Sequence, residues 1–283
     1  MRLDIKELLL SVFILLTVSG CGGESSTVAE DVIIPDEDII PDEEYSSDAP
    51  DNDHTRYRYL ENNGVFLYYE TENTEIYREI LPDVFDMPER TLVFAFINDF
   101  YEVDYGAAPY KENAIFILAE YQGIEVWHCI YMPVTDEQSM WAGIIGLGLP
   151  KTLGTIDFEK QPPLYTGMAI GEYGGEMRVT LDTANYQITA QIKNELIDLS
   201  LLPSLNIRTG KIIEMGRTGE KGSILQVADA RPDLVTVTYG LADVYTNTDT
   251  IPTSHALDLI PSRIIGAYYM HNTIPFSLTG SPL

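Results

Sequence analysis

Hydrophobic residues along most of the chain fall in short runs that alternate with polar residues or are bounded by turn residues. Runs of this kind, rich in aromatic and β-branched side chains, predict β-strands. The predicted strands lie at residues 64–70, 90–97, 113–121, 124–134, 176–184, 186–192, 211–216, 223–230 and 233–240. Only Gln122 and Gly123 separate the third run from the fourth, a spacing that predicts a β-hairpin.

Helical periodicity is rarer along the chain. Residues 73–81 place apolar side chains on one face, and Pro82 would end that helix. Residues 260–270 fit either a last helix or a strand. The pattern as a whole predicts one β-rich α+β domain over residues 57–283, with a closed or strongly curved sheet and a few helices.

A second predicted helix leads to an isolated lysine. Residues 135–146 open with Thr135 and carry Gln138 three positions later, which is the pattern of a capping box. Pro150 cannot continue the helix, so we expect Lys151 to enter a loop. Lys151 is the single charged residue in the stretch GIIGLGLPKTLG, residues 143–154.

The first twenty residues follow the pattern of a targeting segment. Two positive residues precede an apolar run that is shorter than the roughly 20 residues needed to span a bilayer, as in a secretory signal peptide. The segment VSGC, residues 18–21, resembles the lipobox of bacterial lipoproteins, which implies cleavage before Cys21 and lipidation of its sulfur. An uncleaved membrane anchor is the alternative. Both predict an exported protein attached to the cell envelope, at the outer membrane where the cell has one.

Residues 21–56 are predicted to form an acidic tether. Residues 22–55 contain 12 Asp or Glu and no Lys or Arg, and their prolines and like charges oppose compaction. They contribute −12 to a formal net charge of −27 for the whole chain. A domain that is itself acidic argues against a nucleic-acid partner and against lying flat on an anionic membrane.

Most familiar catalytic patterns are absent from the sequence. The four histidines are not at metal-ligand spacing, and no C-x-x-C or G-x-S-x-G occurs, so we predict no metal site. Pro150 stands where a phosphate loop needs a glycine N–H, and Lys151 stands where a dinucleotide motif needs its third glycine. Cys129 lies in an alternating apolar run and is expected to be a core residue.

A lysine among apolar residues is a candidate nucleophile. Lysine is ordinarily protonated near neutral pH, because its pKa is about 10.4, and burial in an apolar pocket lowers the pKa of such a group. A neutral amine can add to a ketone, and the protonated imine accepts the electrons left by a departing carboxylate or proton. From these residues alone, a surface lysine in a glycine-rich loop is the ordinary explanation.

Several short motifs resemble the acetoacetate decarboxylase family. The matching segments are GLGLPKTLG (146–154), YKEN (110–113), HCIY (128–131), EIYREILPDVFDM (75–87), GGEMRV (174–179) and LDLIPSRIIGAYY (257–269). The first is similar to the family's active-site segment Pro-Lys-Lys-Leu-Gly, and the second is similar to its Tyr-x-Glu-Ser. The similarity covers residues from about 58 to about 275.

The resemblance implies a fold, a ligand and a site. The fold would be a closed or strongly curved antiparallel sheet, a cone or barrel, and a homo-oligomer is compatible with it. Lys151 would be the Schiff-base lysine and Glu112 a proton handler or orienting group beside it. The ligand would be a small keto acid or other carbonyl compound, and no cofactor would be needed. Thr152, Ile144 and Ile145 would belong to the substrate pocket.

The sequence also departs from this family's pattern. Thr152 stands where the family has a second lysine, and Ile144 and Ile145 replace an Arg-Glu pair. The family's early arginine has no counterpart near residues 61–65, and a second glutamate is replaced at Ala95 or the residue after it. Activation of the lysine would therefore have to come from burial.

Three functions stay open on this basis. The first is decarboxylation of a β-keto acid, or the related aldol or dehydration chemistry that passes through the same enamine. The second is a binding module for a small apolar or carbonyl ligand that has lost the chemistry. The third is a structural or interaction role for an acidic lipoprotein.

Overall fold

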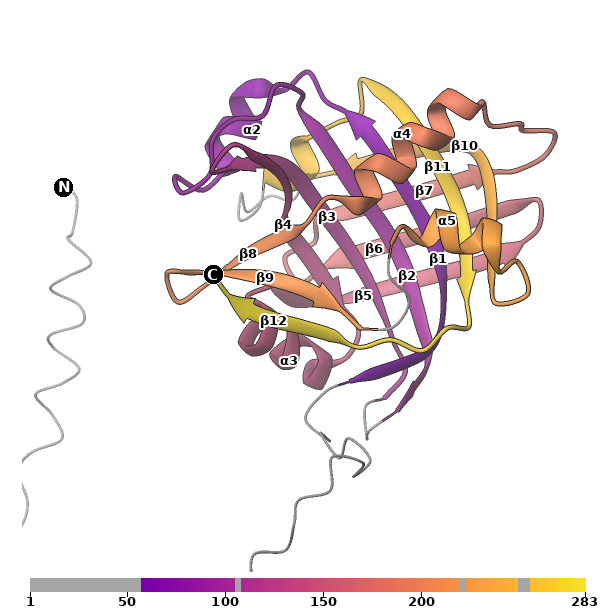
Figure 1. Cartoon of the computed structure of the whole chain (residues 1–283), viewed down its shortest axis with the longest axis horizontal. Helices are drawn as coiled ribbons and strands as arrows, with labels where there is room; N and C mark the ends of the chain where they lie inside the picture. Colours follow the sequence, from indigo (N-terminus) through magenta and orange to yellow (C-terminus); the bar gives the residue numbers. More distant parts are fainter. Residues whose placement is uncertain (1–56, 105–107, 219–221, 249–254) are drawn as a thin grey trace, which may run out of the picture. The chain divides into compact units, whose positions relative to one another are not determined.

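The computed structural model describes residues 57–104, 108–218, 222–248 and 255–283 (Figure 1). The predicted signal peptide at 1–20, lipidation of Cys21 and the tether at 21–56 lie outside the described residues. Among the residues that are described, no helix is both long enough and apolar enough to cross a membrane.

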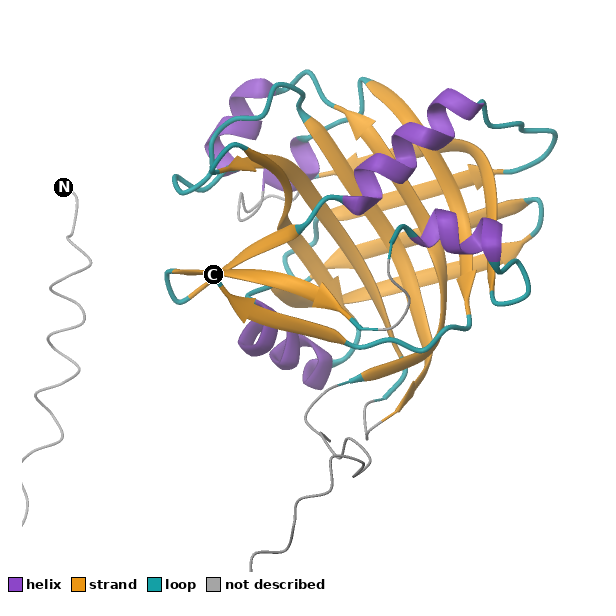
Figure 2. Ribbon diagram, in the orientation of Figure 1, coloured by secondary structure: helices purple, strands orange, loops and turns teal. Residues whose placement is uncertain are grey.

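Nine strands close into a barrel (Figures 1 and 2), which confirms the predicted closed sheet. In barrel order they are β1 (Arg58–Glu70), β2 (Leu92–Asp104), β3 (Tyr110–Tyr121), β4 (Ile124–Val134), β5 (Lys151–Gln161), β6 (Leu164–Gly171), β7 (Glu176–Asp182), β10 (Val235–Asn247) and β11 (Arg263–Asn272), which pairs back to β1. All neighbours in the barrel are antiparallel except β4 and β5. Helix α3 (Glu137–Leu147) connects that pair, and β5 starts beside the last residues of β4, with Lys151 opposite Met132, and runs on in the same direction.

A three-stranded extension joins the barrel at β4. It consists of β8 (Ser204–Arg208), β9 (Lys211–Arg217) and β12 (Leu278–Pro282). The first half of β4 pairs with β8 through Trp127 and Ser204, whereas Met132 and the two residues after it pair with β5. Strand β4 is thus a branch point, and it brings the extension and the start of β5 onto one strand.

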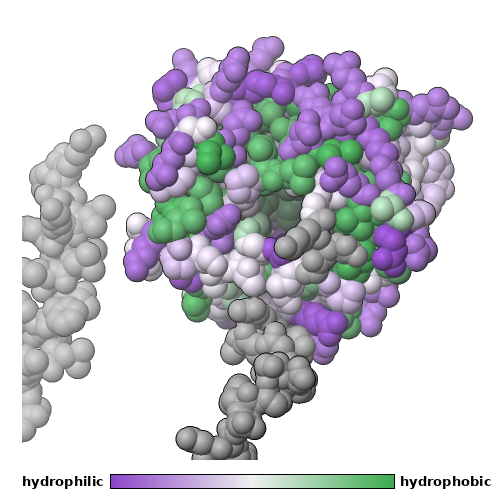
Figure 3. Space-filling view, viewed as in Figure 1, coloured by the Kyte–Doolittle hydropathy of each residue, from purple (hydrophilic) through white to green (hydrophobic). Residues whose placement is uncertain are grey.

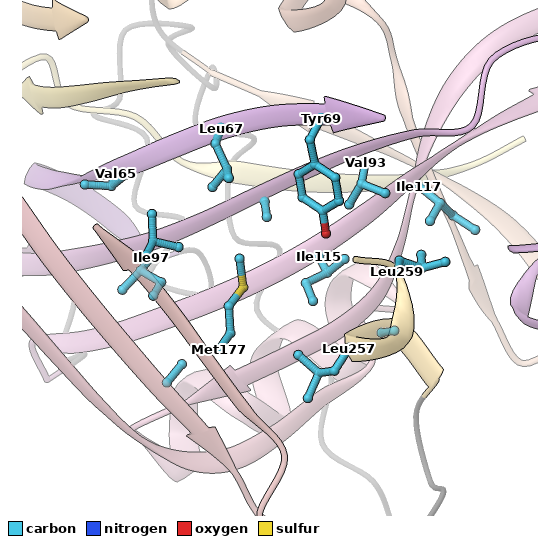
Figure 4. Packing of buried hydrophobic residues seen from close by; sticks show 14 of the residues in the cluster. Val65, Leu67, Tyr69, Val93, Ile97, Ile115, Ile117, Met177, Leu257 and Leu259 are labelled. Carbon is cyan, nitrogen blue, oxygen red and sulfur yellow. The ribbon is translucent and has the colours of Figure 1, made fainter. Parts of the chain in front are cut away.

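The inside of the barrel is filled by hydrophobic side chains (Figure 4). Val65, Leu67 and Tyr69 of β1 point inward and are fully buried. Because side chains alternate along a strand, Phe66 and Tyr68 point to the outer face, where they join a second hydrophobic cluster. The packed interior leaves the outer face as the place for a site.

Two helices cover much of that outer face. Helices α4 (Ala190–Leu201) and α5 (Ile224–Ala230) lie across the barrel strands in Figure 1 and contribute Leu196, Leu199 and Leu225 to the second cluster. The indole N–H of Trp127 donates to the carbonyl of Leu199 at 2.8 Å, which ties α4 to β4. Figure 3 shows this face hollowed at its centre, with hydrophobic residues around the hollow.

Residues 186–192 and 223–230, which were predicted as strands, contribute instead to α4 and α5. The side chain of Thr189 accepts the N–H of Ile192 at 3.2 Å and caps α4. Ser223 and Gln226 form a capping box at the start of α5. The strand prediction from a short alternating window was wrong for both segments. A capping residue at the start of each helix and buried side chains in its following turns stabilise the helical conformation.

Other local predictions are confirmed. Helix α2 (Thr74–Ile80) ends before Pro82, and residues 260–270 lead into strand β11. Gln122 and Gly123 both have positive φ, 54° and 79°, as a two-residue type I′ hairpin requires. A short 3₁₀ helix, η1 (His255–Asp258), precedes β11.

Truncation of Leu196 tests the covering role of α4. Leu196 is fully buried against the barrel, so Leu196→Ala should lower the free energy of unfolding by about 2–5 kcal/mol. Leu201 on the same helix is 49% exposed, and Leu201→Ala should change the free energy of unfolding by no more than about 0.5 kcal/mol. Urea unfolding of the domain measures both, and equal effects would contradict this packing.

Candidate active site

Lys151 lies at the junction of α3 and β5. Helix α3 ends at Gly148, whose left-handed φ of 67° turns the chain, and the N–H of Leu149 donates to the carbonyl of Gly143 at 3.2 Å. Lys151 is then the first residue of β5 and pairs with Met132 of β4. The expectation that it enters a loop is wrong, because the parallel pairing with β4 begins at this residue.

The start of α3 also differs from the prediction. The N-cap residue is Asp136, whose side chain accepts the N–H of Ser139 at 2.7 Å. The hydroxyl of Thr135 accepts the N–H of Lys111 on β3 at 2.9 Å instead. The helix therefore begins one residue later than the capping-box pattern indicated, and Thr135 holds β3 and the end of β4 together.

A buried ion pair joins Lys151 to Glu112. Lys151 Nζ donates to Glu112 Oε2 at 2.5 Å, and the two side chains are 4% and 7% exposed. Glu112 alternates with Tyr110 and Ala114 on the outer face of β3, above the second hydrophobic cluster. Nζ also lies 5.4 Å from the centre of the Tyr110 ring, within the range of a cation–π contact. The structure thus brings together the two residues expected to be catalytic.

Two tyrosines complete the polar part of the site. The hydroxyls of Tyr59 and Tyr110 are 3.0 Å apart. Burial, and next the carboxylate of Glu112, raise the pKa of each phenol, so both stay protonated. Burial likewise raises the pKa of the Cys129 thiol, which is a core residue as predicted. The ion pair is thus surrounded by phenols and a thiol that keep their protons.

A cavity of about 360 Å³ opens beside Lys151. One face of α3 lines it, through residues three and four positions apart, and the extension lines the opposite side. The lining residues are Tyr57, Tyr59, Ser139, Ala142, Gly143, Gly146, Leu147, Lys151, Arg208, Leu278, Thr279, Gly280 and Ser281. Glu112 is not one of the described residues that line the cavity, and it lies behind Lys151, to which it is hydrogen-bonded. A volume of this size fits a small organic ligand.

Gly143 allows α3 to approach the lysine. A Cβ atom at this position would lie 2.5 Å from both Cδ and Cε of Lys151, closer than two carbon atoms can approach. A larger residue would have to displace the lysine side chain. The glycine was visible in the stretch around Lys151, but its contact with the lysine depends on the tertiary fold.

Three residues expected in the pocket lie elsewhere among the described residues. Ile144 and Ile145 are on another face of α3, where they line a separate apolar groove with Leu149. Thr152 follows Lys151 on β5, and its side chain points to the opposite face of the strand. Side chains that are adjacent in sequence point in different directions on a helix and on a strand. Residues close to Lys151 in sequence therefore need not share its cavity.

The sequence did not reveal two other residues of the cavity. Arg208 comes from β8, far along the chain, and reaches the cavity because β8 pairs with β4. Ser139 stands on α3 one turn before Gly143. No motif marks either residue, since their positions depend on the branch at β4 and on the face that α3 presents.

Comparison with known families identifies the chain. The model of the family described as acetoacetate decarboxylase (ADC) matches residues 46–275, and the chain belongs to this family. It is also similar to Decarboxylase DEC1 of Cochliobolus heterostrophus, with 30% identity over 108 residues. That match covers 38% of this chain and 42% of DEC1, so the likeness spans less than half of either protein.

Solved structures share the fold at low sequence identity. Acetoacetate decarboxylase from Legionella pneumophila aligns with a TM-score of 0.61 and 14% identity, over 84% of this chain and 93% of that one. The enduracididine biosynthesis enzyme MppR, in complex with pyruvate, aligns with a TM-score of 0.53 and 15% identity, over 80% and 90% of the two chains. These likenesses confirm the predicted fold.

The ion pair can be tested by a double-mutant cycle. Lys151→Met leaves a carboxylate buried without a partner, and Glu112→Leu leaves an ammonium, so each should lower the free energy of unfolding by about 3–5 kcal/mol. The double variant buries no unpaired charge and should be much closer to wild type. Urea unfolding of all four proteins measures the coupling, and additive losses would show that the pair is not a unit.

Proposed function

We propose that this member of the acetoacetate decarboxylase family uses Lys151 to form a Schiff base with a small keto acid or related carbonyl compound. The observation that carries the proposal is the buried contact of 2.5 Å between Lys151 Nζ and Glu112 Oε2 at the edge of a cavity of about 360 Å³. An amine held this way can reach a ligand in the cavity while its proton has a base to move to.

The first step is a proton transfer within the pair. A lysine adds to a carbonyl only as the neutral amine, whereas an ion pair holds the ammonium. Moving one proton from Nζ to the Glu112 carboxylate converts two buried charges into two neutral groups, without a change in total charge. A neutral pair buries no charge, whereas an ion pair has to be desolvated.

The amine then attacks the carbonyl carbon. In this mechanism Glu112 returns its proton to the carbinolamine oxygen, which leaves as water, and the product is a protonated imine on Lys151. The imine accepts the electron pair of a breaking bond, either to a carboxylate that leaves as CO₂ or to an α-proton. Protonation of the resulting enamine and hydrolysis release the product and restore the amine.

Related proteins support a carbonyl ligand of this class. The family name and the name of DEC1 both refer to decarboxylation, and the MppR structure contains pyruvate, a keto acid. This chain keeps the lysine and the glutamate of the motif, Lys151 and Glu112, in direct contact. These similarities favour imine chemistry and leave the reaction after the imine to be determined.

A binding module without turnover is the second candidate. The positions at which the family carries further charged groups hold Thr152, Ile144 and Ile145, and none of these three lines the cavity in the described residues. Such a protein would hold a carbonyl ligand, with or without an imine, but would neither release CO₂ nor exchange α-protons.

Borohydride trapping tests the Schiff base. The domain should form a reducible adduct with keto acids or ketones, located on Lys151 by peptide mass spectrometry and lost in Lys151→Ala. Gly143→Ala should reduce it, because the new Cβ displaces the lysine side chain. Lys211 is exposed outside the cavity, and Lys211→Ala should leave the adduct unchanged.

The outcomes separate the two candidates. An adduct on Lys151 together with CO₂ release, or with deuterium exchange at the α-carbon, supports the enzyme. An adduct without either reaction supports the binding module. A domain that gives no adduct with any carbonyl compound contradicts the proposed function.

We also propose that the protein is exported and held to the membrane by lipid on Cys21. The support is the apolar signal pattern and the VSGC segment that ends at this cysteine. Metabolic labelling with a palmitate analogue should mark the wild-type chain in the membrane fraction, and Cys21→Ser should abolish the label. A Cys21→Ser protein that is labelled and membrane-bound like wild type would contradict lipidation.

A further inference from the structure

The cavity beside Lys151 contains a second cation, Arg208. One nitrogen of its guanidinium, Nη1, donates to the carbonyls of Ile145 and Gly146 at 2.7 and 3.0 Å. These carbonyls belong to the last turn of α3, where carbonyl groups lack partners within the helix. Arg208 therefore caps α3 and lines the cavity at the same time.

Part of the guanidinium stays free for a ligand. It carries five N–H donors, of which Nη1 holds two. Within the described part of the chain, neither Nη2 nor Nε makes a hydrogen bond, and no carboxylate pairs with Arg208. Lys151 is balanced by Glu112, and the end of a helix carries only about half a negative charge. Among the described residues that line the cavity, Arg208 is therefore the cation that has no carboxylate partner.

The spacing along α3 relates these groups to one another. The aliphatic part of the Lys151 side chain lies against Gly143, and Arg208 binds the carbonyl of Gly146. Gly143 and Gly146 are about one turn apart on the face of α3 that lines the cavity. Both cations therefore line one small cavity, in which a single short ligand can contact the two.

We propose that Arg208 binds the carboxylate of the ligand while Lys151 meets its carbonyl group, so that the cavity selects short keto acids over neutral ketones. The inference rests on the proposed function and assigns its specificity to a residue on β8. A planar guanidinium suits a carboxylate because it can donate two parallel hydrogen bonds.

A matched pair of ligands isolates the role of the charge. Levulinate is a methyl ketone with a carboxylate, and 2-butanone is the same ketone without it. Borohydride trapping over a range of concentrations gives the half-saturating concentration of each. Arg208→Gln should raise this value for levulinate by about tenfold or more, the usual loss for a charge-assisted hydrogen bond, and leave 2-butanone unchanged. Arg208→Lys should retain part of the preference. Arg78 is exposed on α2, and Arg78→Gln is the control for a lost surface charge.

The results distinguish this inference from the proposed function. If Arg208→Gln weakens both ligands equally, Arg208 acts only as a helix cap and the inference is overturned. It is also overturned if levulinate is unaffected. Butanoate has no ketone, so its binding, followed by ligand-observed NMR, does not need an imine. Butanoate binding that is lost in Arg208→Gln supports the carboxylate site even if trapping fails, and butanoate binding that is absent or independent of Arg208 overturns it.

Discussion

The contact between Lys151 and Glu112 imposes the strictest demand on this structure. Two opposite charges shielded from water are costly to desolvate, and they are tolerated only when each has its partner in good geometry. The partners come from β3 and from the start of β5. Anything that shifts α3, which precedes β5, also shifts the lysine. The close approach of α3 at Gly143 makes room for the lysine side chain where a Cβ atom would collide with it.

The hydrophobic core that stabilises the barrel and the cavity beside Lys151 lie in different parts of the fold. The interior of the barrel is packed with hydrophobic side chains, so it provides a rigid wall rather than a binding pocket. The site lies on the outer face, where strand β4 branches to pair with both β5 and β8. The branch places the extension opposite α3, and the space between them is the cavity. The same extension carries Arg208, whose guanidinium donates hydrogen bonds to carbonyls in the last turn of α3.

The proposed chemistry depends on how the charges are arranged. Neighbouring phenols and the Cys129 thiol have raised pKa values and keep their protons, so they surround the pair without competing for its proton. In the proposed mechanism, one proton transfer from Lys151 to Glu112 removes both buried charges and gives the neutral amine. Thr152, Ile144 and Ile145 stand where the family carries charged groups. Among the described residues of the cavity, the cation that has no carboxylate partner, Arg208, is on β8.

The sequence by itself determined strands β1 to β4, β7, β9 and β10 and the hairpin at Gln122 and Gly123, and its resemblance to the family singled out Lys151 and Glu112. These features depend on local preferences, such as alternation and turn geometry, or on short motifs that are read one residue at a time. Alternation in a short window failed for α4 and α5, where Thr189 and Ser223 act as helix caps. Only the tertiary structure decided which side chains share the cavity. Ile144 and Ile145 are close to Lys151 in sequence but lie on another face of α3, whereas Arg208 is distant in sequence and lines the same cavity. The physical reason is that side-chain direction and strand pairing over long separations set these contacts, and neither is encoded in a local pattern.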